Sequence, residues 1–236
     1  MPPSGSLVNE TLAIIPARGG SKRIPGKNLR LFHGRPILLY SIEAALGAGV
    51  FSEVLVSTDS DEIAATAQRA GAKVPFRRSA KASDDVATTA DVLLEVLNEY
   101  GRGGRRFAAF CCLYPTAPFV TSERLRHAME QLSKDGVDSV IPVVRFSYPI
   151  QRALQIQDGL LSMIEPKFMS SRSQDLPPAY HDVGQFYCAR TDAFLRSRTL
   201  FMPATRAIVV PEGEAQDIDT EEDWKLAELK YERLGR

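Results

Sequence analysis

The stretch IIPARGGSKRIPGKN, residues 14–28, decides how the rest of this sequence is interpreted. A short apolar run ends in two glycines, and four cationic side chains follow within ten residues. Residues 11–42 hold six Lys or Arg and no Asp or Glu, although the whole chain balances 29 basic against 29 acidic residues. A glycine-rich turn after a strand exposes backbone N–H groups that bind anions. We therefore expect this loop to bind phosphate groups.

The spacing of the loop differs from the two common phosphate-binding motifs. Five residues separate Gly20 from Gly26 where Walker A requires four, and Asn28 stands where Ser or Thr should follow the lysine. The dinucleotide fingerprint G-x-G-x-x-G is also absent. A solvated cationic turn would explain the charges, but not the glycines, Pro25 and the position after the first strand.

Length and composition indicate one ordinary globular domain. The chain has 236 residues, 44% hydrophobic and 25% charged, and no net charge. Neutrality argues against a broad nucleic-acid or membrane surface, so we expect neither partner. No apolar stretch is long enough to cross a bilayer, the N-terminus lacks the features of a signal peptide, and three cysteines form no disulfide framework. We expect a flexible segment at 1–10, a single domain at 11–236, and a cytoplasmic location.

Short apolar strands alternate with amphipathic helices along most of the chain. Strands are expected at 12–17, 53–57, 107–113, 139–144, 185–189 and 207–210, with an extended piece at 72–76. Helices are expected at 36–46, 61–69, 89–100, 121–133 and 221–234. This order predicts an α/β fold with a doubly wound, mostly parallel sheet, in which ligands bind at the carboxyl ends of the strands.

The alternation is interrupted at about 145–185. This segment is rich in Pro, Ser, Gln and Arg and has only brief extended pieces, at 153–156 and 160–164. We interpret it as an insertion that leaves the main sheet as a small arm, and only the family resemblance described below makes it an arm used for dimerisation.

A pair of carboxylates near the C-terminus complements the basic loop. Asp217 and Asp219 are two residues apart, so in extended chain they project to the same side. Adjacent carboxylates repel unless a cation lies between them, and Mg²⁺ beside a phosphate site is typically held by one or two carboxylates. Alternatively, Asp219 belongs to the cap of the final helix.

Taken together, the motifs resemble those of the sugar-acid cytidylyltransferases, the CMP-sialic acid synthetase family. The matching segments are the A-R-x-G-S-K-R-x-P-x-K-N signature at 17–28, VSTDS at 56–60, ASDD at 82–85 with Thr88 and Thr89, LYPTAP at 113–118, and DIDT at 217–220. They follow the family's order from residue 12 to about 224. The resemblance implies a nucleotidyltransferase fold of the GT-A-like kind, CTP as substrate, and a homodimer.

The same resemblance implies roles for individual residues. Arg18, Lys22 and Lys27 would be the catalytic cations that neutralise the triphosphate. Asp217 and Asp219 would hold Mg²⁺, or Mn²⁺ in its place. The other residues expected to contact CTP are Ala17, Gly19, Gly20, Ser21, Asn28, Arg77 and Thr88, while Arg78 is expected to be a surface neighbour.

The sugar side is indicated by YHDVGQFY at 180–187, which resembles the pseudaminic acid branch of the family. Candidate sugar-binding residues are Tyr114, His181, Gln185 and Tyr187. Tyr114 and Val120 stand where the sialic-acid enzymes carry Gln and Arg, so sialic-acid contacts are not transferred to them.

The implied reaction joins CMP from CTP to the C2 hydroxyl of pseudaminic acid, a nine-carbon sugar acid, and releases pyrophosphate. Alternatives are N-acetylneuraminic, legionaminic or ketodeoxyoctonic acid as the acceptor, or a nucleotide-binding module without turnover.

Overall fold

A seven-stranded sheet forms the centre of the protein. The computed structural model describes residues 10–84 and 86–235, so the expected flexible segment at 1–10 lies, apart from Glu10, outside these residues. The strand order is β11-β6-β10-β5-β1-β4, and β9 pairs with the free part of β6. The strands are β1 (Thr11–Pro16), β4 (Glu53–Ser57), β5 (Ala109–Leu113), β6 (Ser139–Arg145), β9 (Tyr180–Asp182), β10 (Phe186–Arg190) and β11 (Thr205–Val209).

The sheet is mixed but mostly parallel, as expected. β1 runs parallel to β4 and to β5, and β11 runs parallel to β6. β10 is antiparallel to both β5 and β6, and β9 is antiparallel to β6. The sequence did not reveal the direction of β10, because a buried strand has the same apolar pattern in either direction.

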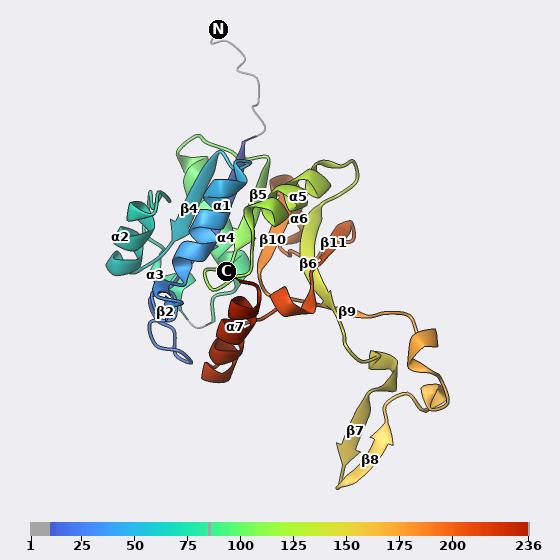
Figure 1. Cartoon of the computed structure of the whole chain (residues 1–236). Coiled ribbons are helices and arrows are strands. Elements are labelled where there is room, and N and C mark those ends of the chain that lie inside the picture. Colours follow the sequence, from blue (N-terminus) through green and yellow to red (C-terminus); the bar gives the residue numbers. More distant parts are fainter. Residues whose placement is uncertain (1–9, 85, 236) are drawn as a thin grey trace.

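Helices cover both faces of the sheet (Figure 1). On one face, α1 (Leu38–Ala48), α2 (Asp61–Arg69) and α5 (Ser122–Ser133) pack against Ala13 and Ile15 of β1. On the other, α4 (Thr89–Arg102) and α6 (Thr191–Ser197) pack against Leu12 and Ile14. Successive residues of β1 point to opposite faces, which explains why its apolar run is continuous.

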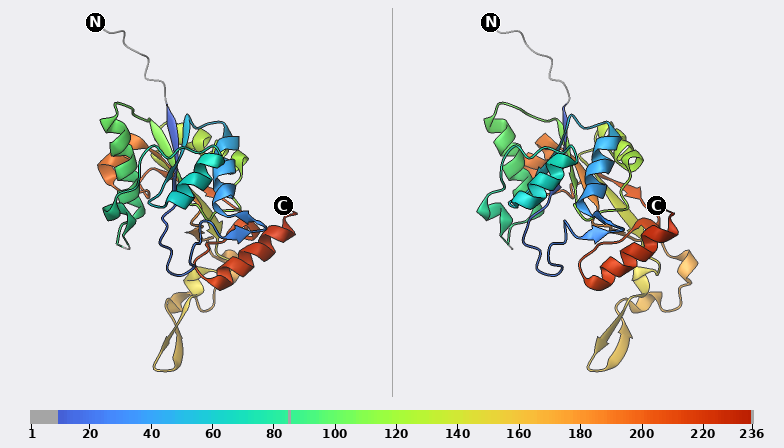
Figure 2. Two further views of the ribbon diagram at one scale, coloured as in Figure 1. Left: turned by 90° about the vertical axis from the view of Figure 1, so that its left-hand side faces the viewer. Right: turned by 60° about the vertical axis from the view of Figure 1, so that its left-hand side comes forward.

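A third apolar cluster lies beside the carboxyl edge of the sheet. The hairpin of β2 (Leu31–Phe32) and β3 (Arg35–Pro36) packs against α7 (Glu221–Arg233). Phe32 and Trp224 meet edge to face with their ring centroids 5.7 Å apart. Both views in Figure 2 place the blue loop that follows β1 beside the red helix α7.

The segment that interrupts the alternation extends away from the sheet (Figure 1). Its hairpin consists of β7 (Leu154–Gln157) and β8 (Leu160–Met163). Single turns of 3-10 helix flank the hairpin at η1 (Ile150–Arg152), η2 (Pro166–Phe168) and η3 (Ser173–Asp175).

Two expected elements differ from the structure for local reasons. The helix expected at 36–46 is α1, which begins at Leu38 because Pro36 pairs with Leu31 in the short hairpin. The piece at 72–76 contributes only an isolated bridge between Lys73 and Leu55, since Pro75 has no N–H to extend the pairing.

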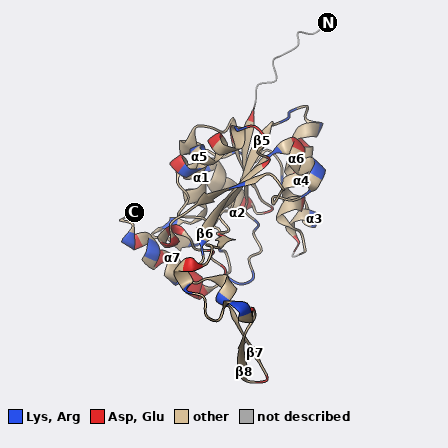
Figure 3. Cartoon of the chain, turned by 90° about the vertical axis from the view of Figure 1, so that its right-hand side faces the viewer, with Lys and Arg blue, Asp and Glu red and all other residues tan. Residues whose placement is uncertain are grey.

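The charges of the surface are mixed in sign. Figure 3 shows Lys or Arg and Asp or Glu interspersed along α7 and α5. No helix among the described residues is long and apolar enough to cross a membrane.

Candidate active site

The basic loop, the end of β5 and the carboxylate pair meet around one cavity. It has a volume of about 360 Å³ and lies at the carboxyl ends of β1 and β5. Its lining residues are Pro16, Arg18, Ser21, Lys22, Arg23, Lys27, Asn28, Tyr114, Pro115, Thr116, Asp217 and Asp219. Segments separated by about 100 residues in sequence therefore converge where a doubly wound sheet binds its ligands.

Contacts with the end of β4 and with the Asp59 side chain that follows it hold the start of the basic loop. The N–H of Ala17 donates to Ser57 O (2.9 Å), and the N–H of Gly19 donates to Asp59 Oδ1 (2.8 Å). A Cβ at Gly19 would lie 3.2 Å from the Cβ of Ser60, so this close approach favours glycine. Gly20 has open space on its Cβ side. The start of the loop is thus fixed, and Ala17, Gly19 and Gly20 do not line the cavity themselves.

Asn28 supports the loop from behind. Its side chain is buried, and Nδ2 donates to the carbonyl of Arg18 (2.9 Å). This bond ties the two ends of the loop together. The predicted contact of Asn28 with CTP stays a prediction, but its role in shaping the loop is visible.

Cations from the loop contact the carboxylate segment directly. Lys27 Nζ donates to the carbonyl of Ile218 and lies 3.5 Å from Asp219 Oδ1. Arg23 Nη1 lies 2.9 Å from Asp219 Oδ2. Arg23 and Lys27 therefore both compensate the charge of Asp219, and Lys27 keeps its predicted role toward the triphosphate.

The carboxylate pair has the chemistry of a divalent-cation site. Desolvation raises the pKa of Asp217, and the charge of Asp219 raises it further, although Lys27 partly offsets both effects. Two hard oxygen ligands that repel each other beside a cationic loop suit Mg²⁺ together with phosphate oxygens. Asp219 also precedes Thr220, whose side chain accepts the N–H of Asp223 in a capping box at α7. The segment therefore also caps α7, as the alternative expected, but the capping residue is Thr220 and not Asp219.

Arg77 and Thr88, which the resemblance places at the cytosine end of CTP, do not line this cavity. Arg77 is exposed and bonds to Asp61, and Thr88 caps α4 in a capping box with Asp91. Their contacts with the base remain predictions. Asp85, in the ASDD segment of the resemblance, lies outside the described residues.

The expectation for Arg78 was wrong. Arg78 is only 6% exposed, and its guanidinium donates to the hydroxyl (3.1 Å) and carbonyl (2.6 Å) of Ser57. Desolvation lowers its pKa, whereas the charges of Asp59 and Glu95 oppose that shift. A buried cation that supports the carboxyl end of β4 was missed because adjacent arginines look alike in sequence, and only the fold decides which one turns inward.

The candidate sugar-binding residues lie in three different environments. Tyr114 lines the cavity, and its ring meets that of Tyr187 edge to face at 5.6 Å. His181 lines a second cavity of about 450 Å³, which shares Asp217 with the first. Gln185 is completely buried and donates from Nε2 to Glu214 O (2.6 Å), so the structure brings it to neither cavity.

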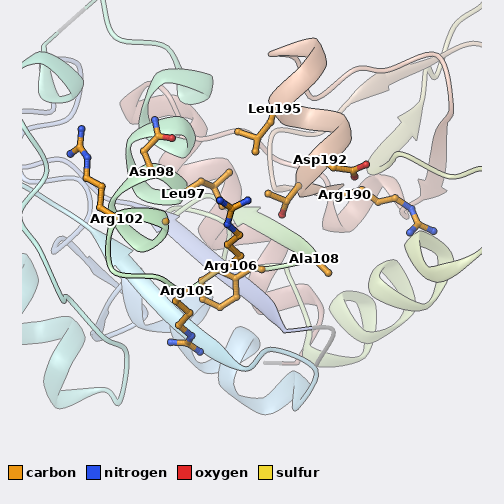
Figure 4. A pocket seen from close by; sticks show the side chains of 12 residues that line it. Leu97, Asn98, Arg102, Arg105, Arg106, Ala108, Arg190, Asp192 and Leu195 are labelled. Carbon is orange, nitrogen blue, oxygen red and sulfur yellow. The ribbon is translucent and has the colours of Figure 1, made fainter. Parts of the chain in front are cut away.

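A larger cavity of about 970 Å³ lies at the opposite edge of the sheet, beside the start of β5. Figure 4 shows that Arg102, Arg105 and Arg190 point in different directions around it. Arg105 is engaged by Glu10 and Glu53. Because its cations do not converge, this cavity does not compete with the smaller one as the candidate active site.

Comparison with known proteins agrees with the geometry. Residues 12–162 match the family described as Cytidylyltransferase. The chain is 40% identical to the pseudaminic acid cytidylyltransferase of Campylobacter jejuni, over 94% of this chain and 96% of the relative. It is 34% identical to the CMP-N,N'-diacetyllegionaminic acid synthase of Legionella pneumophila, over 94% of this chain and 98% of that one.

A solved structure shows the same fold. CMP:2-keto-3-deoxy-manno-octonic acid synthetase, determined in complex with CTP, superposes with a TM-score of 0.69 at 19% identity, covering 95% of this chain and 99% of the other. The chain belongs to the cytidylyltransferase family, enzymes that transfer a cytidylyl group from CTP. Within that family, its similarity is greater to the pseudaminic acid enzyme of Campylobacter jejuni than to the legionaminic acid enzyme of Legionella pneumophila.

Proposed function

We propose that this protein transfers CMP from CTP to the C2 hydroxyl of pseudaminic acid, giving CMP-pseudaminic acid and pyrophosphate. The observation that carries the proposal is the convergence of the basic loop and the Asp217–Asp219 pair on one cavity. The 40% identity to a pseudaminic acid cytidylyltransferase supports the choice of acceptor. The intact set of cations and carboxylates disfavours a module that only binds nucleotide.

The cations of the basic loop would provide most of the electrostatic stabilisation of the transition state. In phosphoryl transfer, negative charge moves onto the leaving pyrophosphate, and fixed cations that face it lower the barrier. Arg18, Lys22 and Lys27 line the cavity and are proposed for that role. Asp217 and Asp219 would hold Mg²⁺, which polarises phosphate oxygens when bound.

Tyr114 and the second cavity are proposed to receive the acceptor. Because Asp217 lines both cavities, an acceptor in the second would lie beside the same carboxylate as the nucleotide. His181 is the sugar contact that this placement favours, whereas Tyr187 is buried and donates its hydroxyl to Asp182. The three described cysteines are free, which is consistent with the proposed cytoplasmic location.

We also propose that the arm joins two copies of this chain. Cross-strand pairing places Leu154, Ile156, Leu161 and Met163 on one face of the hairpin, while Gln155, Gln157 and Ser162 share the other, more polar face with Leu160. Ile156 is 75% exposed and Leu161 is 64% exposed. An amphipathic hairpin with an uncovered apolar face is typical of a protein–protein contact.

The dimer can be tested by the mass measured in solution. Light scattering after size exclusion should give twice the chain mass for the unsubstituted protein and the monomer mass for Ile156→Lys. Gln155→Lys adds the same charge to the polar face and should stay dimeric. A monomeric unsubstituted protein would refute the dimer but not the transfer reaction.

The reaction is tested by pyrophosphate release with CTP, Mg²⁺ and one acceptor at a time. Release with pseudaminic acid but not with N-acetylneuraminic or legionaminic acid would support the proposal. Asp219→Asn should abolish the release, whereas Asp135→Asn, on an exposed loop, should not. Release only with another acid would replace the acceptor, and no release despite CTP binding would favour the non-catalytic module.

A further inference from the structure

A turn formed by residues 182–184 lies directly behind Asp217. Both carboxylate oxygens of Asp182 are engaged: Oδ1 accepts the N–H of Gly184 (3.0 Å), and Oδ2 accepts the hydroxyl of Tyr187. Asp182 itself is fixed at the end of β9, where it pairs with Val143 of β6. The side chain of Asp182 thus connects the edge of the sheet, the turn and a neighbouring strand.

Gly184 brings bare backbone against the carboxylate of Asp217. Its φ is +62°, a left-handed conformation that favours glycine. A Cβ at this position would lie 3.3 Å from both Cγ and Oδ2 of Asp217, and 3.6 Å from Oδ1. An added methyl group would therefore have to displace the carboxylate or the turn.

We propose that Asp182 and Gly184 are positioning residues for Asp217. The bond from Gly184 N–H to Asp182 fixes the turn, and the turn limits where the Asp217 carboxylate can lie. Asp182 also lines the second cavity, but it would act on the cation site only through Gly184, without contact to the cation. This inference rests on the proposed function, because it assigns the turn to the cation site of that reaction. It also explains why Asp182, beside the candidate sugar residue His181, points its carboxylate toward Tyr187 and the turn.

The chain offers a matched control for the glycine. Gly136 has a φ of +71° and no atom within 4 Å of a built Cβ. Alanine at Gly136 therefore brings the same kind of backbone strain as alanine at Gly184, without crowding a carboxylate. Any difference between the two variants reports the contact with Asp217.

Asparagine is a conservative substitution for Asp182. In Asp182→Asn, the amide oxygen can still accept the Gly184 N–H, and the amide nitrogen can donate to the Tyr187 oxygen. In Asp182→Ala, both links are lost. Loss in the alanine variant with rescue by asparagine would show that the hydrogen bonds matter, since the charge of Asp182 is absent from both.

The experiment measures how strongly Mg²⁺ enhances CTP binding, with no acceptor present and hence no turnover. Titration calorimetry gives the Kd of CTP in EDTA and in saturating Mg²⁺, and the ratio of the two values reports the cation site. Removing groups that orient metal ligands typically costs 10–100-fold in metal affinity. We expect the enhancement to fall about tenfold or more in Asp182→Ala and Gly184→Ala, and to stay within about twofold of the parent in Asp182→Asn and Gly136→Ala. The Kd in EDTA should change by less than about twofold in all four variants, because none of them replaces a residue of the cavity that holds the loop cations.

An unchanged enhancement in Asp182→Ala and Gly184→Ala would overturn the inference while leaving the proposed function intact. If Asp182→Ala fails to fold, the comparison of Gly184→Ala with Gly136→Ala decides the question. A parent protein whose CTP affinity does not depend on Mg²⁺ would overturn the proposed cation site, and the inference with it.

Discussion

The ion pair between Arg124 and Glu214 should be the most stabilising salt bridge near the site. Arg124 Nη2 lies 2.8 Å from Glu214 Oε2, and the two side chains are only 14% and 15% exposed. At an effective dielectric constant of about 20, opposite charges at this distance attract with about 6 kcal/mol, although most of that attraction offsets their desolvation. Glu214→Gln leaves the arginine buried without its counter-charge, which typically costs 3–5 kcal/mol. Since some water still reaches the pair, we expect a loss of about 2–4 kcal/mol.

The chain contains a comparison pair at the same distance. Arg196 Nη1 and Asp192 Oδ2 are also 2.8 Å apart, but their side chains are 69% and 68% exposed. Exposed pairs of this i,i+4 kind contribute about 0.3–0.5 kcal/mol. Asp192→Asn should therefore change the free energy of unfolding by at most about 0.5 kcal/mol. The difference between the two variants isolates the effect of burial from that of geometry.

Urea unfolding measures both variants against the parent. A lower midpoint at an unchanged m-value reports a loss of stability rather than a change in the unfolded state. A double-mutant cycle with Arg124→Met gives the coupling energy of the buried pair. The reasoning would be refuted if Glu214→Gln cost less than about 1 kcal/mol, or no more than Asp192→Asn.

Three further outcomes follow from the described contacts. Lys27→Met should lower kcat/KM for CTP about 10²–10³-fold in the pyrophosphate assay, because it removes a cation that contacts the carboxylate segment and is proposed to face the phosphates. Burial raises the pKa of Glu53, but hydrogen bonds from Tyr100 and Arg105 outweigh it, and the pKa is lowered below its usual 4.5. The stability that Glu53 contributes is therefore complete above pH 4.5 and is lost as the pH falls through the lower folded-state pKa, so Glu53→Gln should flatten the acid side of a plot of Tm against pH. Phe32→Ala should cost about 3–5 kcal/mol in urea unfolding, because this fully buried ring contacts Tyr40, Trp224 and Tyr231.

The sheet could be predicted from the sequence. Predictions for individual elements were wrong where contacts with residues distant in sequence determine the local structure. Buried strands such as residues 12–17 are visible as continuous apolar runs because helices cover both faces. The helix expected from Pro36 begins two residues later. Pro36 belongs to a two-residue strand, which is recognisable only from its pairing with Leu31 in the structure. The amino-acid composition of β10 does not indicate its direction. That the sheet contains antiparallel as well as parallel strands is therefore seen only in the strand pairing of the structure.

For the candidate site, motif order predicted the convergence, but not the orientation of individual side chains. Carboxyl ends of parallel strands share one edge, so the basic loop and the segment at 113–118 had to lie near each other. Arg78 and Gln185 were misplaced because their burial depends on packing against Ser57 and against the carbonyl of Glu214. Neither contact has a signature in the residues that flank them.

Apolar packing, rather than charge, brings the two halves of the site together. Ile24 of the basic loop and Ile218 of the carboxylate segment are both completely buried in one cluster with Phe119 and Trp224. Charge attraction alone would let Lys27 and Asp219 meet in many geometries, since flexible side chains keep contact as the backbone shifts. Two isoleucines in a close-packed cluster permit far fewer backbone positions. Packing of the apolar cluster therefore sets how the loop cations and the carboxylates face each other.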